Sequence, residues 1–247
     1  MKKTVKERFL KHWEEYFDDA ELPIAAYYTD EDTVPENEPS ASRCLIADLN
    51  KVRKGTPLRF GSTSIGCPGG RRYSGFSEAL GEGFEYFLSC GIPGKIRGER
   101  YKKSPELVRK LLSESPRYVA PRKYIVFKRW DQLEEMDEPE VVVFFAEPDV
   151  IAGLFTLANY DVNEDGVVAP FGSGCSSIIM HPCLEGERDT PRCVFGMFDP
   201  SARPYVGSSC LTFAAPMNRF TQMVENMPES FLVTSTWEKI KKRIAHP

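Results

Sequence analysis

The stretch Val141-Val142-Val143-Phe144-Phe145, followed by Ala146-Glu147-Pro148-Asp149-Val150, decides the fold class. Five consecutive apolar side chains, all β-branched or aromatic, favour a strand, and the lack of alternation indicates that both of its faces are covered. Pro148-Asp149 then opens an apolar helix, predicted over about 149–159, because proline is well tolerated in the first helical turn. The stretch is therefore a strand–turn–helix unit, which is typical of a sheet with helices packed on it.

Strand and helix patterns alternate along the rest of the chain. The first helix, predicted over residues 4–18, begins with a capping box of Thr4 and Glu7 and has apolar side chains every four residues. Further strands are predicted at 24–28, 58–60, 124–127, 193–198 and 211–215, and further helices at 41–52, at 77–89 and from Pro105, Pro216 and Ser235. Ser104 should cap the helix at Pro105, whose core side is Leu107, Val108, Leu111 and Leu112. We predict an α/β or α+β fold, a mixed β-sheet flanked by helices, with two similar halves around one core as an option.

The composition is that of a globular protein. The chain has 247 residues, of which 41% are hydrophobic and 28% charged, and no linker divides it, so we expect one domain over 1–247. No apolar run approaches the ~18 residues that span a bilayer, and the N-terminal segment is an amphipathic helix rather than a signal peptide. Seven cysteines cannot all pair, which favours reduced thiols. We therefore expect a cytoplasmic protein with no membrane partner.

Charges are segregated along the chain. The net charge of −4 gives no general attraction to nucleic acid, and we expect no nucleic-acid partner. Residues 13–40 contain ten acidic side chains and no Lys or Arg, 131–149 contain eight acidic and none basic, and 95–129 contain twelve basic side chains against three Glu. Two interpretations stay open: faces that complement one another or a partner subunit in a homo-oligomer, and a basic rim around an anionic ligand.

A glycine-rich segment spans residues 61–76 and contains Gly66-Cys67-Pro68-Gly69-Gly70-Arg71-Arg72. Glycine permits close backbone approach, consecutive amides of such a loop can bind an anion, and forked guanidinium groups suit phosphate or carboxylate. Cations beside Cys67 would stabilise its thiolate and make it reactive. The spacing matches neither a Walker loop nor a dinucleotide fingerprint, and a tight connection on the core is the alternative. The candidate ligand-binding residues here are Gly66, Cys67, Gly69, Gly70, Arg71 and Arg72.

A second segment, Phe171-Gly172-Ser173-Gly174-Cys175-Ser176, precedes a run that can be helical. A helix N-terminus presents free amides to anions and favours the thiolate of a cysteine placed there. Ser173 would alternatively be an ordinary N-cap. The candidate ligand-binding residues of this segment are Gly172, Ser173, Gly174 and Cys175.

Catalytic and metal-binding motifs are sparse. The sequence has no Gly-x-Ser-x-Gly elbow, no His-Glu-x-x-His and no Cys-x-x-Cys, and it identifies no cofactor. The candidate catalytic groups are Cys67, Cys175 and His181. The candidate ligands of a metal or an iron–sulfur cluster, in a looser spacing than paired-ligand motifs have, are Cys175, His181, Cys183 and Cys193.

These motifs resemble a known family. Ser64 to Phe76, Glu147-Pro148-Asp149-Val150 and Gly172 to Ser176 are similar to segments of the uncharacterised DUF 169 family of bacteria and archaea, and the resemblance covers roughly residues 10–235. It implies a prokaryotic, cytosolic protein of unassigned activity, and it points to Cys67 and Cys175 as positions of interest. The region around Cys210 departs from the more Gly-rich cysteine motif expected near the end of members, which leaves a third site at Cys210 without support.

The leading functional prediction is a protein that binds a small anionic metabolite or cofactor in a cleft lined by both Gly-Cys segments, at the ends of the sheet strands. Three alternatives stay open. They are a thiol-dependent enzyme that uses Cys67 or Cys175, a metal or iron–sulfur protein, and a non-catalytic oligomeric interaction protein. The leading prediction requires both thiols to face one site, which spans no more than ~15 Å in a typical pocket.

Overall fold

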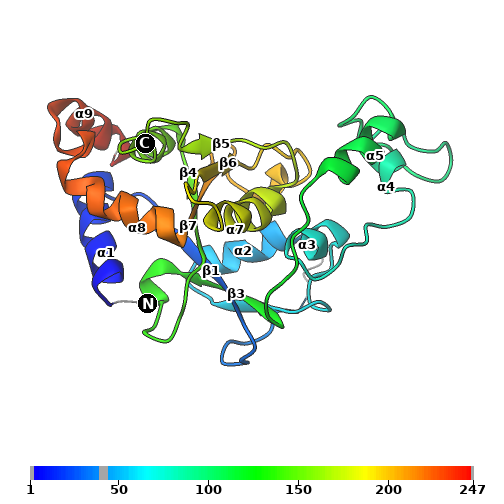
Figure 1. The fold of residues 1–247 in the computed structure, drawn as a ribbon, viewed down its shortest axis with the longest axis horizontal. Helices are drawn as coiled ribbons and strands as arrows, with labels where there is room; N and C mark the ends of the chain where they lie inside the picture. The colour runs from blue at the N-terminus through cyan, green and yellow to red at the C-terminus, as the bar shows by residue number, and fades with distance from the viewer. Residues whose placement is uncertain (1–2, 39–43, 246–247) are drawn as a thin grey trace.

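One β-sheet runs through both halves of the chain in the computed structural model, which describes residues 3–38 and 44–245 (Figure 1). In those residues its seven strands follow the order β2-β3-β1-β4-β7-β6-β5. Only β5 and β6 pair in parallel, so the sheet is mixed, as predicted. The strands are β1 (Ile24–Thr29), β2 (Leu58–Phe60), β3 (Tyr124–Arg129), β4 (Val141–Ala146), β5 (Val167–Val168), β6 (Cys193–Gly196) and β7 (Leu211–Pro216).

Strand β4 is buried on both faces, as its unbroken apolar run predicts. It pairs with β1 on one side and with β7 along its whole length on the other. Its side chains alternate between two hydrophobic clusters, with Phe144 in one and Phe145 in the other. The sheet therefore divides the core into two layers, and β4 belongs to both.

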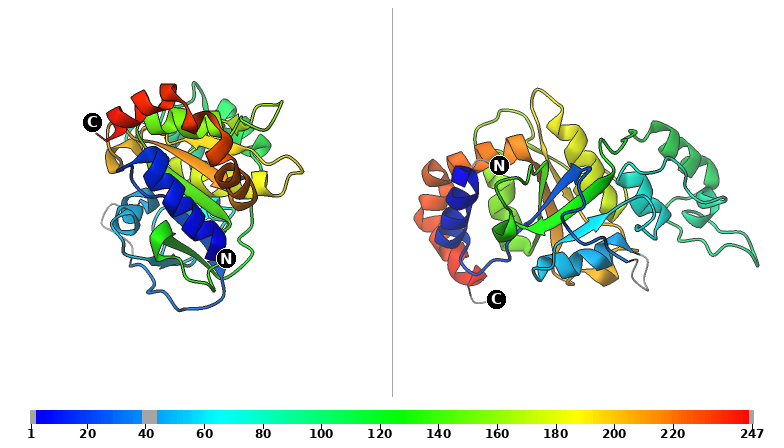
Figure 2. Two further views of the ribbon diagram at one scale, coloured as in Figure 1. Left: turned by 90° about the vertical axis from the view of Figure 1, so that its left-hand side faces the viewer. Right: turned by 90° about the horizontal axis from the view of Figure 1, so that it is seen from below.

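Helices cover both faces of the sheet. The first cluster is closed by α1 (Lys3–Phe17), α6 (Pro148–Leu157), α8 (Met217–Asn226) and α9 (Ser235–Ile244), and α1, α8 and α9 gather at one side of the molecule (Figures 1 and 2). The second cluster is closed by α2 (Leu45–Arg53), α3 (Pro68–Tyr73), the π-helical segment Ser176–Met180 and α7 (His181–Gly186). Short 3-10 turns lie at Trp130–Gln132, Arg203–Tyr205, Met227–Glu229 and Phe231–Val233.

Residues 77–117 form an arm that projects away from the sheet and carries α4 (Phe84–Phe87) and α5 (Pro105–Glu114) (Figures 1 and 2). The two ends of the arm are joined, since the amide of Ala120 donates to the carbonyl of Gly75 at 3.0 Å. Both ends also dock on Tyr28 of β1. Its hydroxyl donates to the carbonyl of Ser74 at 2.8 Å, and its ring lies against that of Tyr118. The sheet therefore fixes the base of the arm.

The prediction of a helix over 77–89 is wrong, since only Phe84–Phe87 is helical. Gly83 has a φ of 76°, which interrupts the helical backbone before α4. The glycine-rich segment was expected to be a loop from its composition, but it contains the helix α3. Helix α2 begins at Leu45 with Cys44 at its N-cap position, and the predicted residues 41–43 lie outside the described part.

Other predicted boundaries shift by one or two residues. Helix α1 already includes Lys3, so Thr4 is not its N-cap. Thr234 rather than Ser235 caps α9 by accepting from the amide of Trp237. Strand β6 ends at Gly196 because the backbone of the next residue turns into the left-handed region.

The cap of α5 is as predicted, but the expected core face of this helix is not. Ser104 accepts from the amide of Leu107, while Leu107 itself is 46% exposed and only Val108 is buried. The reason is that α5 belongs to the projecting arm and has no sheet beneath it.

Part of the charge segregation is compensated within the fold. Arg122 pairs with Asp30 at 3.2 Å, Lys128 with Asp137 at 2.9 Å, and Arg129 with Asp131 at 2.7 Å. These contacts join the end of the basic run to both acidic runs, so the interpretation of complementary faces holds for this region. In the described ranges, no helix combines the length and the apolarity that crossing a membrane requires.

The joint at the base of the arm gives a stability prediction. Gly75 has a φ of 78°, and a Cβ there would lie 2.3 Å from the amide nitrogen of Ala120. Gly75→Ala should therefore lower the free energy of unfolding by at least ~1–3 kcal/mol and loosen the arm, because it adds both strain and a clash. Chemical denaturation and limited proteolysis within 77–117 measure the two effects.

Gly81→Ala is the matched control, because a Cβ at Gly81 meets nothing within 4 Å. Equal stability and equal proteolysis of the two variants would contradict the role of this joint.

Candidate functional site

The two Gly-Cys segments come together on the second face of the sheet. Cys67 occupies the N-cap position of α3, and Cys175 lies in the first turn of a continuous helix, residues 174–186, that includes the π-helical segment and α7. Helix α3 packs against the π-helical segment. Burial raises the pKa of Cys175 well above its ordinary value, and the neighbouring groups of Cys44, Cys67 and Asp199 raise it further.

Cys44, Cys67 and Cys175 thus form one group, which we name the thiol cluster. The pKa of Cys44 is also raised, mainly by burial and in part by Cys67. Cys44 was not predicted as a site residue, because the predicted helix over 41–52 placed it in a helix interior. A signal was present, since all three cysteines stand where a helix begins.

Glycines of both segments serve close packing. A Cβ at Gly70 would lie 2.8 Å from Cγ2 of Ile65, and one at Gly174 would lie 2.9 Å from Sδ of Met197. One at Gly172 would lie 2.5 Å from Oγ of Ser176, whereas Gly69 has ordinary van der Waals room. Gly66 is partly buried beside Cys67. Gly70, Gly172 and Gly174 therefore allow close packing, which was the alternative to ligand binding for the glycine-rich segment.

Two polar groups of residues 172–175 are engaged within the protein. Ser173 caps the helix, since its Oγ accepts from the amide of Ser176 at 3.2 Å. The amide of Gly174 donates to the Asp199 carboxylate, also at 3.2 Å. A negative charge of the protein itself already lies at this helix N-terminus, where it is favourable. The amide of Gly174 is therefore already engaged, while anion binding by residues 172–175 stays a prediction.

The backbone around Cys175 is irregular in two places. Five residues after it are π-helical, a rare form that often marks functional sites. Met197 is buried with a φ of 69°, and its amide donates to Oγ of Ser177 in the π-helical segment. A left-handed conformation at a non-glycine residue costs free energy and tends to occur at functional sites. Both irregularities lie directly beside the thiol cluster.

The two arginines of the first segment differ in their surroundings. Arg72 donates to the carbonyl of Glu78 and interacts with the Tyr73 hydroxyl, so it holds the start of the arm. Arg71 makes no ion pair with any residue in the described ranges. It lies one helical turn after Cys67, and its backbone amide donates to the carbonyl of Cys67 at 3.0 Å. Of the two predicted counter-ions, Arg71 is therefore the available one.

The arm reaches the second segment. Nζ of Lys102 lies 4.0 Å from the ring centroid of Phe171, and Tyr101 forms a hydrogen bond with Ser201, next to Asp199. The three thiols therefore lie at the starts of α2, α3 and the helix 174–186, and the arm contacts residues close to them.

The residues considered as metal ligands do not gather. Cys193 lies in the first hydrophobic cluster, where its Sγ is 3.6 Å from Sδ of Met223, while Cys175 and Cys183 belong to the second. The pKa of His181 is lowered by burial and raised in part by Glu185, and no cysteine affects it. Within residues 3–38 and 44–245, no group of three or more His, Cys, Asp or Glu is arranged to hold a metal ion. The sheet separates Cys193 from Cys175 and Cys183.

Two surface pockets, of about 740 and 340 Å³, lie away from the thiol cluster. The larger is in the arm, and the smaller, apolar one is bordered by α6 and the ends of β4 and β7. Neither is lined by Cys67 or Cys175, so the expected cleft is not among these pockets.

Buried thiols give a prediction for alkaline pH. Burial raises the pKa of Cys183 from 9.0 to about 12, with Tyr118 in hydrogen-bond contact. Above pH 9 the unfolded chain loses this proton while the folded chain keeps it, so the free energy of unfolding should fall between pH 9 and about 12. The slope from this group approaches ~1.4 kcal/mol per pH unit, and urea unfolding at several pH values measures it.

Cys183→Ala should flatten this slope, and Cys90→Ala, at an exposed position, should leave it unchanged. An unchanged slope in Cys183→Ala would refute the assignment.

Comparison with known proteins returns one family. Residues 14–226 match DUF169, a family described as uncharacterised ArCR. No curated protein and no solved structure matches the chain. The match spans the sheet, the thiol cluster and the arm. The chain belongs to the DUF169 family.

Proposed function

We propose that the protein binds a small anionic molecule at the thiol cluster, with Arg71 as its counter-ion. The observation that carries the proposal is the meeting of two Gly-Cys segments from distant parts of the chain beside an arginine without a carboxylate partner. A guanidinium left without an ion pair favours an incoming carboxylate or phosphate.

The ligand is small because the surrounding layers are close together. Gly70 and Gly174 pack without room for a Cβ, and Cys175 is only 7% exposed. Its anionic end lies towards Arg71 rather than towards the amide of Gly174, which donates to Asp199. The raised pKa values of Cys44 and Cys175 keep these two groups neutral, so they do not repel an anion. Reduced thiols of this kind suit a cytoplasmic location.

Substitution of Arg71 tests the proposal. Isothermal titration against a panel of carboxylated and phosphorylated metabolites should find a ligand, and Arg71→Ala should weaken its binding at least tenfold. A charge-assisted hydrogen bond contributes ~1.5–3 kcal/mol, and tenfold corresponds to ~1.4 kcal/mol.

Arg8→Ala is the control, since Arg8 pairs with Glu225 on the opposite face of the sheet. The proposal fails if no member of the panel binds, or if Arg71→Ala binds as the wild type does.

A second candidate function is thiol chemistry at Cys67. Cys67 is partly exposed and lies one helical turn before Arg71, whereas Cys175 is buried with a raised pKa. A nucleophilic thiolate needs access and a nearby positive charge. Of the predicted catalytic groups, Cys67 therefore meets these conditions best, and His181 has no thiol among its electrostatic neighbours.

Alkylation of the native protein tests this second candidate. Iodoacetamide at neutral pH should modify Cys67 much faster than Cys175, with exposed Cys90 as the reference for an ordinary accessible thiol. Mass spectrometry of peptides at successive times gives the rates. Labelling of Cys67 more slowly than Cys90 would argue against an activated thiol, and the same measurement on Arg71→Ala shows whether the guanidinium contributes.

A further inference from the structure

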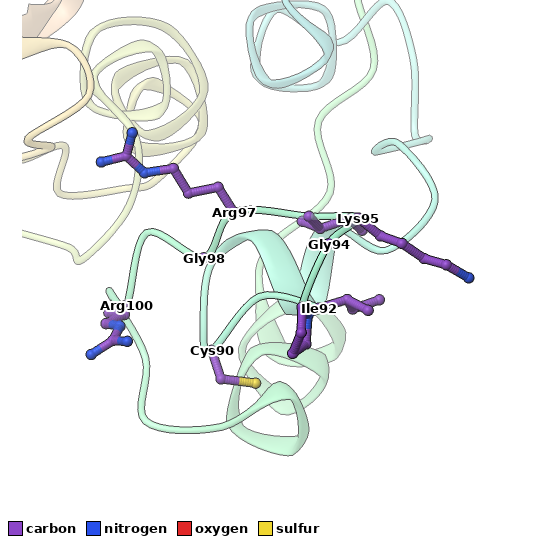
Figure 3. A pocket seen from close by; sticks show the side chains of 9 residues that line it. Cys90, Ile92, Gly94, Lys95, Arg97, Gly98 and Arg100 are labelled. Atoms are coloured by element: carbon purple, nitrogen blue, oxygen red, sulfur yellow. The ribbon is translucent and has the colours of Figure 1, made fainter.

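The arm contains a second site of a different kind. Its pocket of about 740 Å³ is lined by the loop from Cys90 to Arg100 (Figure 3). Three of the lining residues are cations and none is a carboxylate, namely Lys95, Arg97 and Arg100. In the view of Figure 3, Arg97 and Arg100 leave the loop on the same side, and Lys95 extends to the other. We name residues 90–103 the basic loop, which contains five basic side chains and one acidic.

The cations of this pocket differ from the other basic residues of the arm. Arg109 pairs with Glu85 at 3.2 Å and with Glu106 at 3.0 Å, and Arg117 pairs with Glu78 at 3.5 Å. Lys95, Arg97 and Arg100 form no ion pair and no side-chain hydrogen bond with any residue of the described ranges. The three cations of the pocket therefore differ from the paired arginines Arg109 and Arg117 of the same arm.

The backbone of the basic loop is held tightly. Ile92 and Ile96 exchange two backbone hydrogen bonds of 2.8 and 2.9 Å, which close the tip of the loop. A Cβ on Gly98 would lie 2.3 Å from the amide nitrogen of Gly91, so the backbone segments at these two glycines are in close contact. Arg100 has a φ of 59° although it carries a full side chain. Such strain persists where the surroundings enforce it, and it tends to accompany binding sites.

We propose that the basic loop binds the phosphate groups of a small phosphorylated molecule, with Arg97 and Arg100 as the main ligands. Guanidinium groups bind phosphate oxygens in forked pairs. The pocket volume lies within the ~300–1,000 Å³ of small-molecule sites. The net charge of −4, with acidic runs at 13–40 and 131–149, opposes the approach of a long nucleic acid and favours a compact ligand.

Inorganic pyrophosphate and ATP are the probes, titrated calorimetrically at physiological ionic strength. Both should bind the wild type, and the double variant Arg97→Ala/Arg100→Ala should bind at least tenfold more weakly. Arg109→Ala/Arg117→Ala is the matched control, because it removes the same number of arginines from the same arm where they are already paired. Thermal unfolding of both variants shows that the fold is kept.

Cys90 supplies an independent readout, since it is exposed and lines the pocket. Bound pyrophosphate should slow alkylation of Cys90 and leave that of Cys67 unchanged, and Arg71→Ala should not alter pyrophosphate binding. These outcomes also separate this site from the thiol cluster.

The inference is overturned if neither probe binds, if both double variants lose affinity equally, or if Cys90 is not protected. Tighter binding of a single-stranded RNA that depends equally on all four arginines would overturn it as well, in favour of an extended surface.

Discussion

Burial of β4 on both of its faces is the constraint on which the rest of the structure depends. A strand in this position can satisfy its backbone only by pairing on both sides, which β1 and β7 provide. Phe144 contacts Phe9, Trp13, Phe213 and Phe220 on one face, and Phe145 lies in the other cluster beneath Arg53. Each such side chain contributes ~1.5–3 kcal/mol by leaving water. The helices on both faces are placed by this requirement.

Close packing between the layers then determines the chemistry of the thiol cluster. A Cβ on Gly196 of β6 would lie 2.2 Å from Cβ of Ser177, so the π-helical segment rests directly on the sheet. Cys175, directly before this segment, is buried, and burial raises its pKa. The cluster therefore presents the neutral thiols of Cys44 and Cys175. These two groups do not repel an anion, and Cys67 is left as the accessible thiol.

Electrostatics separate the two proposed sites. Most basic side chains near the sheet have acidic partners, as Arg122 and Arg129 do. Asp199 fills the helix N-terminus beside Cys175, which leaves Arg71 as the cation for a ligand there. The basic loop, by contrast, lies on the projecting arm (Figure 1), and Lys95, Arg97 and Arg100 are exposed there. A phosphorylated ligand in the arm and a small anion at the thiol cluster would thus be bound by different residues.

The sequence by itself determined every described strand except β5, and most helices, because long apolar runs such as Val141–Phe145 and the Ser104 cap act locally. It also pointed to Cys67 and Cys175, which stand beside glycines at helix starts. It failed where the outcome depends on distant partners. Only the tertiary structure shows that Cys44 lies near the other two thiols and that the Gly174 amide donates a hydrogen bond to Asp199. It also shows that Cys193 lies on the opposite face of the sheet from Cys175. The physical reason is that burial, pKa and ion pairing arise from contacts between segments that no local pattern encodes.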